Sequence, residues 1–226
     1  MLKAIMAACF LVSATASATL AAEVTVGSDI VLFGGVANSY FGGGDKGLLG
    51  DGSRSAGTAG VAFMLRVNPD FGFEADVRMT QKGGEGEIDI TDYTGVNNGP
   101  TIVGEGTTRL TYVEIPLLLA AHLALSETSY LRAYGGPTFD ILVSANFEGQ
   151  IQGQEANVDI KDGIASFEYG LALGGGYTYD AGKVSFWVDG RWSLGMTSID
   201  DTGKDRDIKN QSVEFALGVG VPLARE

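Results

Sequence analysis

Apolar and polar residues alternate along this chain in repeated stretches, and that alternation restricts its fold more than any other feature. Between residues 71 and 80 one set of alternate positions is wholly apolar, whereas the other set includes Glu74, Asp76 and Arg78. Successive side chains of a β-strand point to opposite faces, so such a stretch has one apolar and one polar face. A strand that crosses a membrane needs about 9–11 residues. The pattern therefore predicts an all-β chain whose strands are long enough to cross a membrane.

Eight segments show this alternation or a less regular form of it. They are residues 30–40, 58–67, 71–80, 107–123, 130–145, 167–179, 184–194 and 213–221. The connections between them alternate in length: those at 68–70, 125–129 and 180–183 are short, and those at 41–57, 83–106, 146–165 and 195–211 are long. Bacterial outer-membrane barrels have short periplasmic turns, long outer loops and an even number of strands. We therefore expect an eight-stranded antiparallel up-and-down transmembrane β-barrel with both termini on the periplasmic side.

The apolar face has the composition expected of a surface in contact with lipid. It carries no charge in segments 71–80, 167–179, 184–194 and 213–221, and a charge at mid-membrane costs about 2–4 kcal/mol. Aromatic residues on this face lie toward the segment ends, as in the girdles that favour membrane interfaces. The expected girdle residues are Phe71, Phe73, Tyr177, Tyr179 and Phe186 near the short turns, and Phe167, Tyr169 and Trp192 near the long loops. A soluble sandwich or a lipocalin-type carrier would share the alternation but would bury the apolar face.

The polar face would line the interior of the barrel. Its charged members are Arg66, Glu74, Asp76, Arg78, Glu114, Arg132, Asp140, Glu168, Asp189, Arg191 and Glu214. Side chains fill the lumen of an eight-stranded barrel, and enclosed charges must pair to offset their desolvation. We expect a structural salt-bridge network, with Arg78 paired to Glu114 or Asp76 and Arg191 paired to Glu168 or Glu214. The alternative is that these charges line a path for ions or solutes.

The first 22 residues have the features of an export signal. The chain begins with the short, positively charged sequence Met1-Leu2-Lys3. An apolar stretch then runs from residue 4 to residue 12, and small residues precede Glu23. We therefore expect a cleaved signal peptide at residues 1–22 and a barrel domain at residues 23–226. Cys9, the one cysteine, would leave with the signal, so the mature chain would hold neither disulfides nor thiolate metal sites.

Charge and residue content exclude other classes of function. A net charge of −13 argues against binding nucleic acid, which requires basic patches. Two acidic groups lie in the long loops, but neither matches a calcium-binding EF-hand loop, and no metal or cofactor is expected. These groups are Glu85, Glu87, Asp89 and Asp92, and Asp200, Asp201, Asp205 and Asp207. The single histidine, His122, falls near the periplasmic end of its segment as an interfacial residue, and no GxSxG motif is present, so no catalytic residues are expected.

The stretch Tyr112-Val113-Glu114-Ile115-Pro116-Leu117-Leu118-Leu119 resembles a "YxEIPLLL" sequence of the bacterial outer-membrane β-barrel family that includes PorT-like proteins. In that family a segment like Ala133-Tyr134-Gly135-Gly136-Pro137 follows, and a glycine-rich strand like residues 169–177 comes later. Such barrels commonly end on an aromatic residue, whereas this chain ends Leu223-Ala224-Arg225-Glu226. The resemblance implies an outer-membrane barrel and, through the family name, a role in secretion.

Together these observations predict a non-enzymatic outer-membrane barrel with a structural or surface-interaction role. Its partners would be membrane lipid and an extracellular partner that contacts loops 41–57, 83–106, 146–165 and 195–211. A narrow pore, a secretion-accessory barrel or a soluble secreted ligand-binding barrel are the alternatives.

Overall fold

The computed structural model describes residues 27–89, 103–151 and 153–225 of the chain. It contains nine β-strands and two short 3-10 helices, η1 (Lys46–Leu49) and η2 (Lys161–Gly163). The strands are β1 (Gly27–Gly42), β2 (Gly52–Arg66), β3 (Phe71–Asp89), β4 (Val103–Ser126), β5 (Ser129–Ile151), β6 (Gln154–Asp159), β7 (Phe167–Asp180), β8 (Ser185–Gly195) and β9 (Lys209–Arg225). Among these described residues, no helix is long and apolar enough to cross a membrane.

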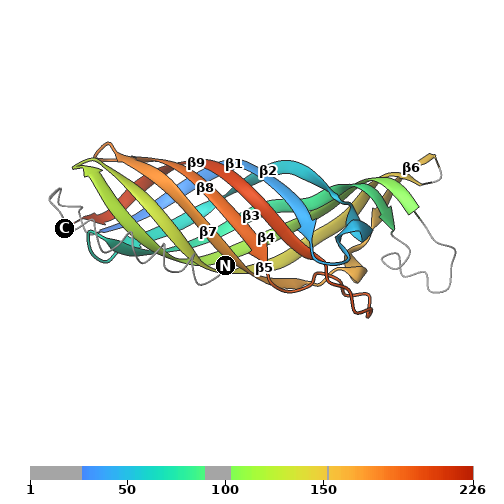
Figure 1. Cartoon of the computed structure of the whole chain (residues 1–226). Helices are drawn as coiled ribbons and strands as arrows, with labels where there is room; N and C mark the ends of the chain where they lie inside the picture. Colours follow the sequence, from blue (N-terminus) through green and yellow to red (C-terminus); the bar gives the residue numbers. More distant parts are fainter. Residues whose placement is uncertain (1–26, 90–102, 152, 226) are drawn as a thin grey trace.

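Eight of the strands close into a barrel. Each pairs antiparallel with its neighbours in the order β4-β3-β2-β1-β9-β8-β7-β5, and pairing of β4 with β5 closes the ring. The strands run obliquely around the barrel, as Figure 1 shows. β6 lies outside the ring and pairs only with the end of β5. The eight predicted strands and their antiparallel closure are therefore confirmed.

The short turns, the start of β1 and the end of β9 all lie at the same end of the barrel. Gly27, which begins β1, faces Arg225, which ends β9. The turn between β2 and β3 is fixed by Asn68, whose Oδ1 accepts hydrogen bonds from the backbone N–H groups of Asp70 (2.9 Å) and Phe71 (2.8 Å).

The opposite end differs from the sequence prediction, because much of the predicted loop sequence is strand. Residues 83–89, 103–106 and 146–151 extend β3, β4 and β5, and β6 adds a fourth strand beside them. This outer extension projects beyond the ring at the end labelled β6 in Figure 1. β3, β4 and β5 are 19, 24 and 23 residues long, against 11 for β8, and about 9–11 residues cross a membrane. The predicted loop bounds were wrong because antiparallel pairing continues past the membrane.

The outside of the ring forms one continuous apolar band. Large apolar side chains on all eight ring strands are exposed, among them Leu32, Phe63, Val77, Leu171 and Leu217. Soluble monomers rarely expose an apolar surface of this extent to water, whereas membrane barrels expose such a surface to lipid. The band is therefore the lipid-facing surface of the barrel.

A second apolar group lies inside the loop end, and we call it the outer plug. Its members are Phe41, Leu49, Ile88, Leu110, Tyr112, Leu142, Ala145, Phe147, Ile160, Ile164, Ile199 and Ile208. Backbone hydrogen bonds tie the connecting segments together over it, including those from Ala165 N–H to the carbonyl of Ile199 (2.8 Å) and from Asp201 N–H to the carbonyl of Gly163 (2.9 Å). Within the described residues, the segments that carry these side chains therefore pack inward onto a hydrophobic core.

Candidate functional site

The eleven predicted inward-facing charges all lie inside the barrel, and each is almost completely buried. They are Arg66, Glu74, Asp76, Arg78, Glu114, Arg132, Asp140, Glu168, Asp189, Arg191 and Glu214. The alternation of the strands accounts for this position, because the residues on either side of each charge point outward into the apolar band. The lumen is consequently the chemically distinctive site of the molecule.

Arg132 is the centre of the periplasmic half of this site. From β5 its guanidinium donates to Glu74 of β3 at 2.5 Å and to Asp189 of β8 at 2.7 Å. It also lies over the ring of Trp187, 4.4 Å from the ring centroid. The hydroxyl of Tyr134 donates to the other oxygen of Asp189 at 2.5 Å. One arginine thus links three strands across the lumen.

Arg191 and Arg78 continue the network toward the loops. Arg191 donates to Asp76 at 2.8 Å and to Glu74 at 3.3 Å, and Arg78 donates to Asp76 and to Glu214, both at 2.7 Å. Of the expected pairs, that of Arg78 with Asp76 is present.

The expected pairing of Arg191 with Glu168 or Glu214 was wrong. Arg191 and Glu214 are register neighbours on β8 and β9, yet Arg191 reaches across the lumen to β3. Inward side chains of a narrow barrel meet residues of opposite strands as readily as those of adjacent ones.

Lys82 is a member of the site that sequence reasoning missed. Its ammonium group lies 2.5 Å from Asp140 and 3.3 Å from Glu114, and the side chain is almost wholly buried. Next to this group, Asn210 donates from Nδ2 to Glu168 at 2.6 Å. Lys82 lies just past the predicted end of its strand, although it continues the run of inward even-numbered positions. Extending the alternation by one step would have found it.

A smaller group of side chains lies at the periplasmic end of the lumen. Arg66 donates to Asp29 at 3.4 Å and lies 5.2 Å from the ring centroid of Tyr130. His122 packs edge-on against the same tyrosine, with centroids 5.4 Å apart. The histidine was predicted as an interfacial residue, and the structure places it inside the barrel, 8% exposed, because it occupies an inward position of β4.

Glycines on β7 make space for these large side chains. A Cβ at Gly174 would collide with the hydroxyl of Tyr134, and a Cβ at Gly176 would lie 2.9 Å from Asp189 Oδ2 and 3.2 Å from Arg132 Nη2. The glycine-rich sequence of this strand is therefore explained by the bulk of the network on the facing strands.

All eight predicted girdle residues are exposed on the outside of the barrel. They are Phe71, Phe73, Tyr177, Tyr179, Phe186, Phe167, Tyr169 and Trp192. Tyr179 and Phe186 are register partners beside the turn between β7 and β8. Tyr169 and Phe167 pack against Phe139 toward the loop end, at centroid distances of 6.0 and 6.4 Å.

One of the two acidic loop groups, that around Asp200, is held by hydrogen bonds and an ion pair. Asp200 accepts a hydrogen bond from Thr202 Oγ1 at 2.8 Å and lies 3.7 Å from Arg206, so this part of the predicted solvated loop is internally bonded. Asp92 lies outside the described residues. Within the described parts of the chain, no group of three or more His, Cys, Asp or Glu side chains could hold a metal ion.

An eight-stranded antiparallel barrel with an apolar exterior and a charge-filled interior defines the class of small outer-membrane barrel proteins. Residues 17–201 match the family described as outer membrane protein beta-barrel domain, and the chain belongs to that family. It is an outer-membrane β-barrel protein. The family match does not test the resemblance to PorT-like proteins, which stays a prediction.

Several solved outer-membrane proteins are similar to the chain. Neisserial surface protein A is 13% identical, with a TM-score of 0.47, over 85% of this chain and 96% of that one. OprG from Pseudomonas aeruginosa is 12% identical, with a TM-score of 0.48, over 89% and 98%. Ail, the attachment invasion locus protein of Yersinia pestis, is 16% identical, with a TM-score of 0.42, over 86% and 99%. No curated protein matches the chain in sequence.

Proposed function

We propose that this protein is a closed, non-enzymatic barrel that acts as a structural or surface-interaction component of the outer membrane. The observation that carries the proposal is the filling of the lumen along its length. The group of Arg66 and Asp29 closes the periplasmic end, the ion network around Arg132 and Arg191 fills the middle, and the outer plug closes the loop end. A path for solutes would have to break both ion pairs and apolar packing.

The outer extension supplies the surface that meets the exterior. Its outward positions are rich in carboxylates: Glu85, Glu87, Asp89, Glu105, Glu148, Glu155 and Asp159. Arg109, paired with Glu148 at 2.8 Å, lies among them. A paired sheet with one face packed on the outer plug is a rigid platform, which favours recognition by shape and charge. We place the extracellular contact on this extension and on the segments that connect the strands, 43–51 and 196–208.

Conductance in planar bilayers tests the closed lumen. We expect the wild-type protein to show no stable openings, and the same for Arg109→Met, which removes a cation from the exposed extension. Stable cation-selective openings in the wild-type protein, with an ion preference that changes in Lys82→Met but not in Arg109→Met, would overturn the proposal in favour of a narrow pore.

Export belongs to the same proposal. Residues 1–22 would direct secretion and be removed, leaving the barrel domain from Glu23 onward. A role in secretion of other proteins rests on the PorT-like resemblance alone and forms no part of the proposed mechanism.

A further inference from the structure

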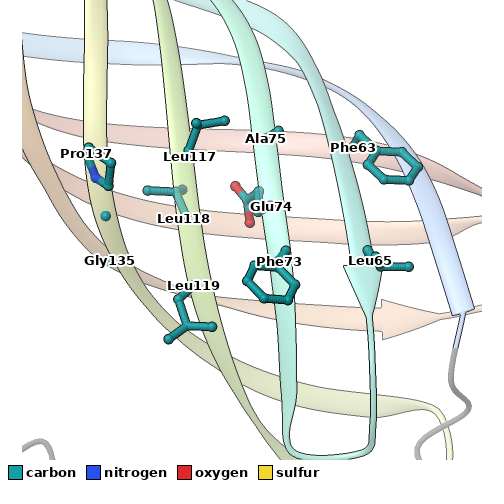
Figure 2. Close-up of a pocket in the computed structure, with 11 residues that line it drawn as sticks. Phe63, Leu65, Phe73, Glu74, Ala75, Leu117, Leu118, Leu119, Gly135 and Pro137 are labelled. Atoms are coloured by element: carbon teal, nitrogen blue, oxygen red, sulfur yellow. The ribbon is translucent and has the colours of Figure 1, made fainter.

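The lipid-facing band contains a depression over β2, β3, β4 and β5, on the wall beside the ion network. It has a volume of about 460 Å³, within the range of about 300–1,000 Å³ typical of ligand pockets. Its rim is formed by large exposed side chains, and its floor by small ones. The rim residues are Phe63, Leu65, Phe73, Leu117 and Leu119, and the floor residues include Ala75, Gly135, Gly136 and Pro137. Figure 2 shows the labelled lining residues side by side on neighbouring strands.

The depression lies where the pairing of the barrel wall is interrupted. Register partners on β4 and β5 end at Pro116 and Thr138 and resume only at Leu119 and Gly135. On the other side of β4, pairing with β3 is interrupted between Ala75 and Arg78. Proline has no N–H to donate, and Pro116 and Pro137 lie at these gaps. Register partners are therefore missing on both sides of β4 at this point, and several of the side chains that line the depression are small.

The inner side of the same wall is also apolar. Leu118 and Ala120 of β4 pack in the lumen against Tyr134 and Ala172. Glu74, which reaches the floor of the depression, is held from inside by Arg132 and Arg191. The floor therefore offers hydrocarbon contacts, while its one carboxylate is already occupied by ion pairs.

We propose that this depression binds the acyl chain of a phospholipid. The depression is continuous with the lipid-facing band, so hydrocarbon chains are the molecules that surround it. An unfilled hollow would lose dispersion contacts on one side, and a flexible chain restores them. Ala75 is the fifth residue of β3, and about 9–11 residues cross a membrane, so the depression lies near the middle of the hydrocarbon region, where acyl chains are the part of a lipid that reaches it.

A second depression provides an internal comparison. It lies over β1, β8 and β9, has a volume of about 580 Å³ and is lined by residues that include Leu32, Phe186 and Leu217, so the two depressions differ in the strand pairing beneath them and not in size class. The pairing of β8 with β9 and of β1 with β9 is unbroken beneath it. We expect this surface to exchange lipid like the rest of the band.

Photo-crosslinking tests the proposal. The protein is reconstituted into phosphatidylcholine vesicles with a trace of phosphatidylcholine that carries a mid-chain diazirine. It is then extracted into dodecyl maltoside and irradiated, so that only retained lipid reacts, and labelled peptides are mapped by mass spectrometry. We expect about fivefold more label on the β3–β5 depression than on the β8–β9 depression, because the fitted surface keeps more contacts with the chain.

Ala75→Leu fills the depression, because Ala75 faces Phe63 and Leu117 in register, and it should reduce the label to the β8–β9 level. Ala59→Leu adds the same volume on an exposed position of β2 outside both depressions and should leave the label unchanged. Heat-modified gel mobility verifies folding, and Ala75→Val replaces the leucine variant if that variant does not fold. Equal labelling of the two depressions, or no effect of filling, would each overturn the proposal.

Discussion

Replacing Arg132 with methionine tests whether the lumen charges hold the barrel together. The change removes the cation that contacts Glu74 at 2.5 Å and Asp189 at 2.7 Å, with all three side chains at most 3% exposed. Glu74 would keep Arg191 at 3.3 Å, and Asp189 would keep the hydroxyl of Tyr134. Methionine preserves much of the apolar stem, so the principal loss is the charge and its hydrogen bonds.

The expected magnitude follows from burial. Removing one partner of a buried ion pair leaves an uncompensated charge and destabilises by about 3–5 kcal/mol. The matched control is Arg109→Met, which breaks a pair with Glu148 of similar length, 2.8 Å, but with side chains 39% and 36% exposed. Exposed pairs contribute roughly 0–1 kcal/mol. The two substitutions therefore differ in burial more than in chemistry.

Urea unfolding in phosphatidylcholine vesicles, followed by gel mobility, measures the free energy of unfolding of both variants. Adding Glu74→Gln and Asp189→Asn to Arg132→Met should restore most of the loss, because no unpaired carboxylate then remains at this point. If Arg132→Met loses no more stability than Arg109→Met, the argument from burial is refuted.

Three further predictions concern the membrane face, the outer plug and export. Val77→Arg and Leu171→Arg should each destabilise the barrel in vesicles by about 2–4 kcal/mol, since both side chains lie in the apolar band; unchanged urea midpoints would contradict the lipid-facing assignment. Ile199→Asp should open the outer plug and make the segment 196–208 sensitive to protease in intact cells, whereas an exposed control, Lys204→Asp, should not. Mass spectrometry of the protein from outer-membrane fractions should give a mature N-terminus at or before Glu23; an intact residue 1 would exclude the cleaved signal.

The sequence predicted best the strands whose two faces meet different surroundings. For β7 the predicted bounds, 167–179, differ by one residue from the observed Phe167–Asp180. One face of this strand meets lipid and the other meets the ion network, so the alternation is sharp. β3 was predicted to end at residue 80 but continues to Asp89. Past residue 80 the outward positions include Glu85, Glu87 and Asp89, and the inward positions are Lys82, Gly84, Gly86 and Ile88, so no regular apolar set marks either face.

The members of the outer plug and the partners in the ion pairs could not be predicted from the alternation of the sequence. Ile160, Ile164, Ile199 and Ile208 are isolated apolar residues in polar segments, and no periodicity connects them. Their burial depends on contacts between loops that are distant in sequence. Likewise, alternation identifies an inward charge but not its partner, because the choice of Arg191 between Glu214 beside it and Asp76 across the lumen depends on how narrow the barrel is.

The outer plug and the ion pairs of Lys82 beneath it depend on one another. Lys82, Glu114 and Asp140 lie directly beneath the outer plug, since Tyr112 belongs to the plug and lies 5.4 Å from the ammonium group of Lys82. Ion pairs strengthen where water is excluded, and the plug excludes water from the loop side. Conversely, the pairs neutralise charges that would otherwise draw water under the plug. Opening the outer plug should therefore weaken these ion pairs, and removing the pairs should weaken the packing of the plug.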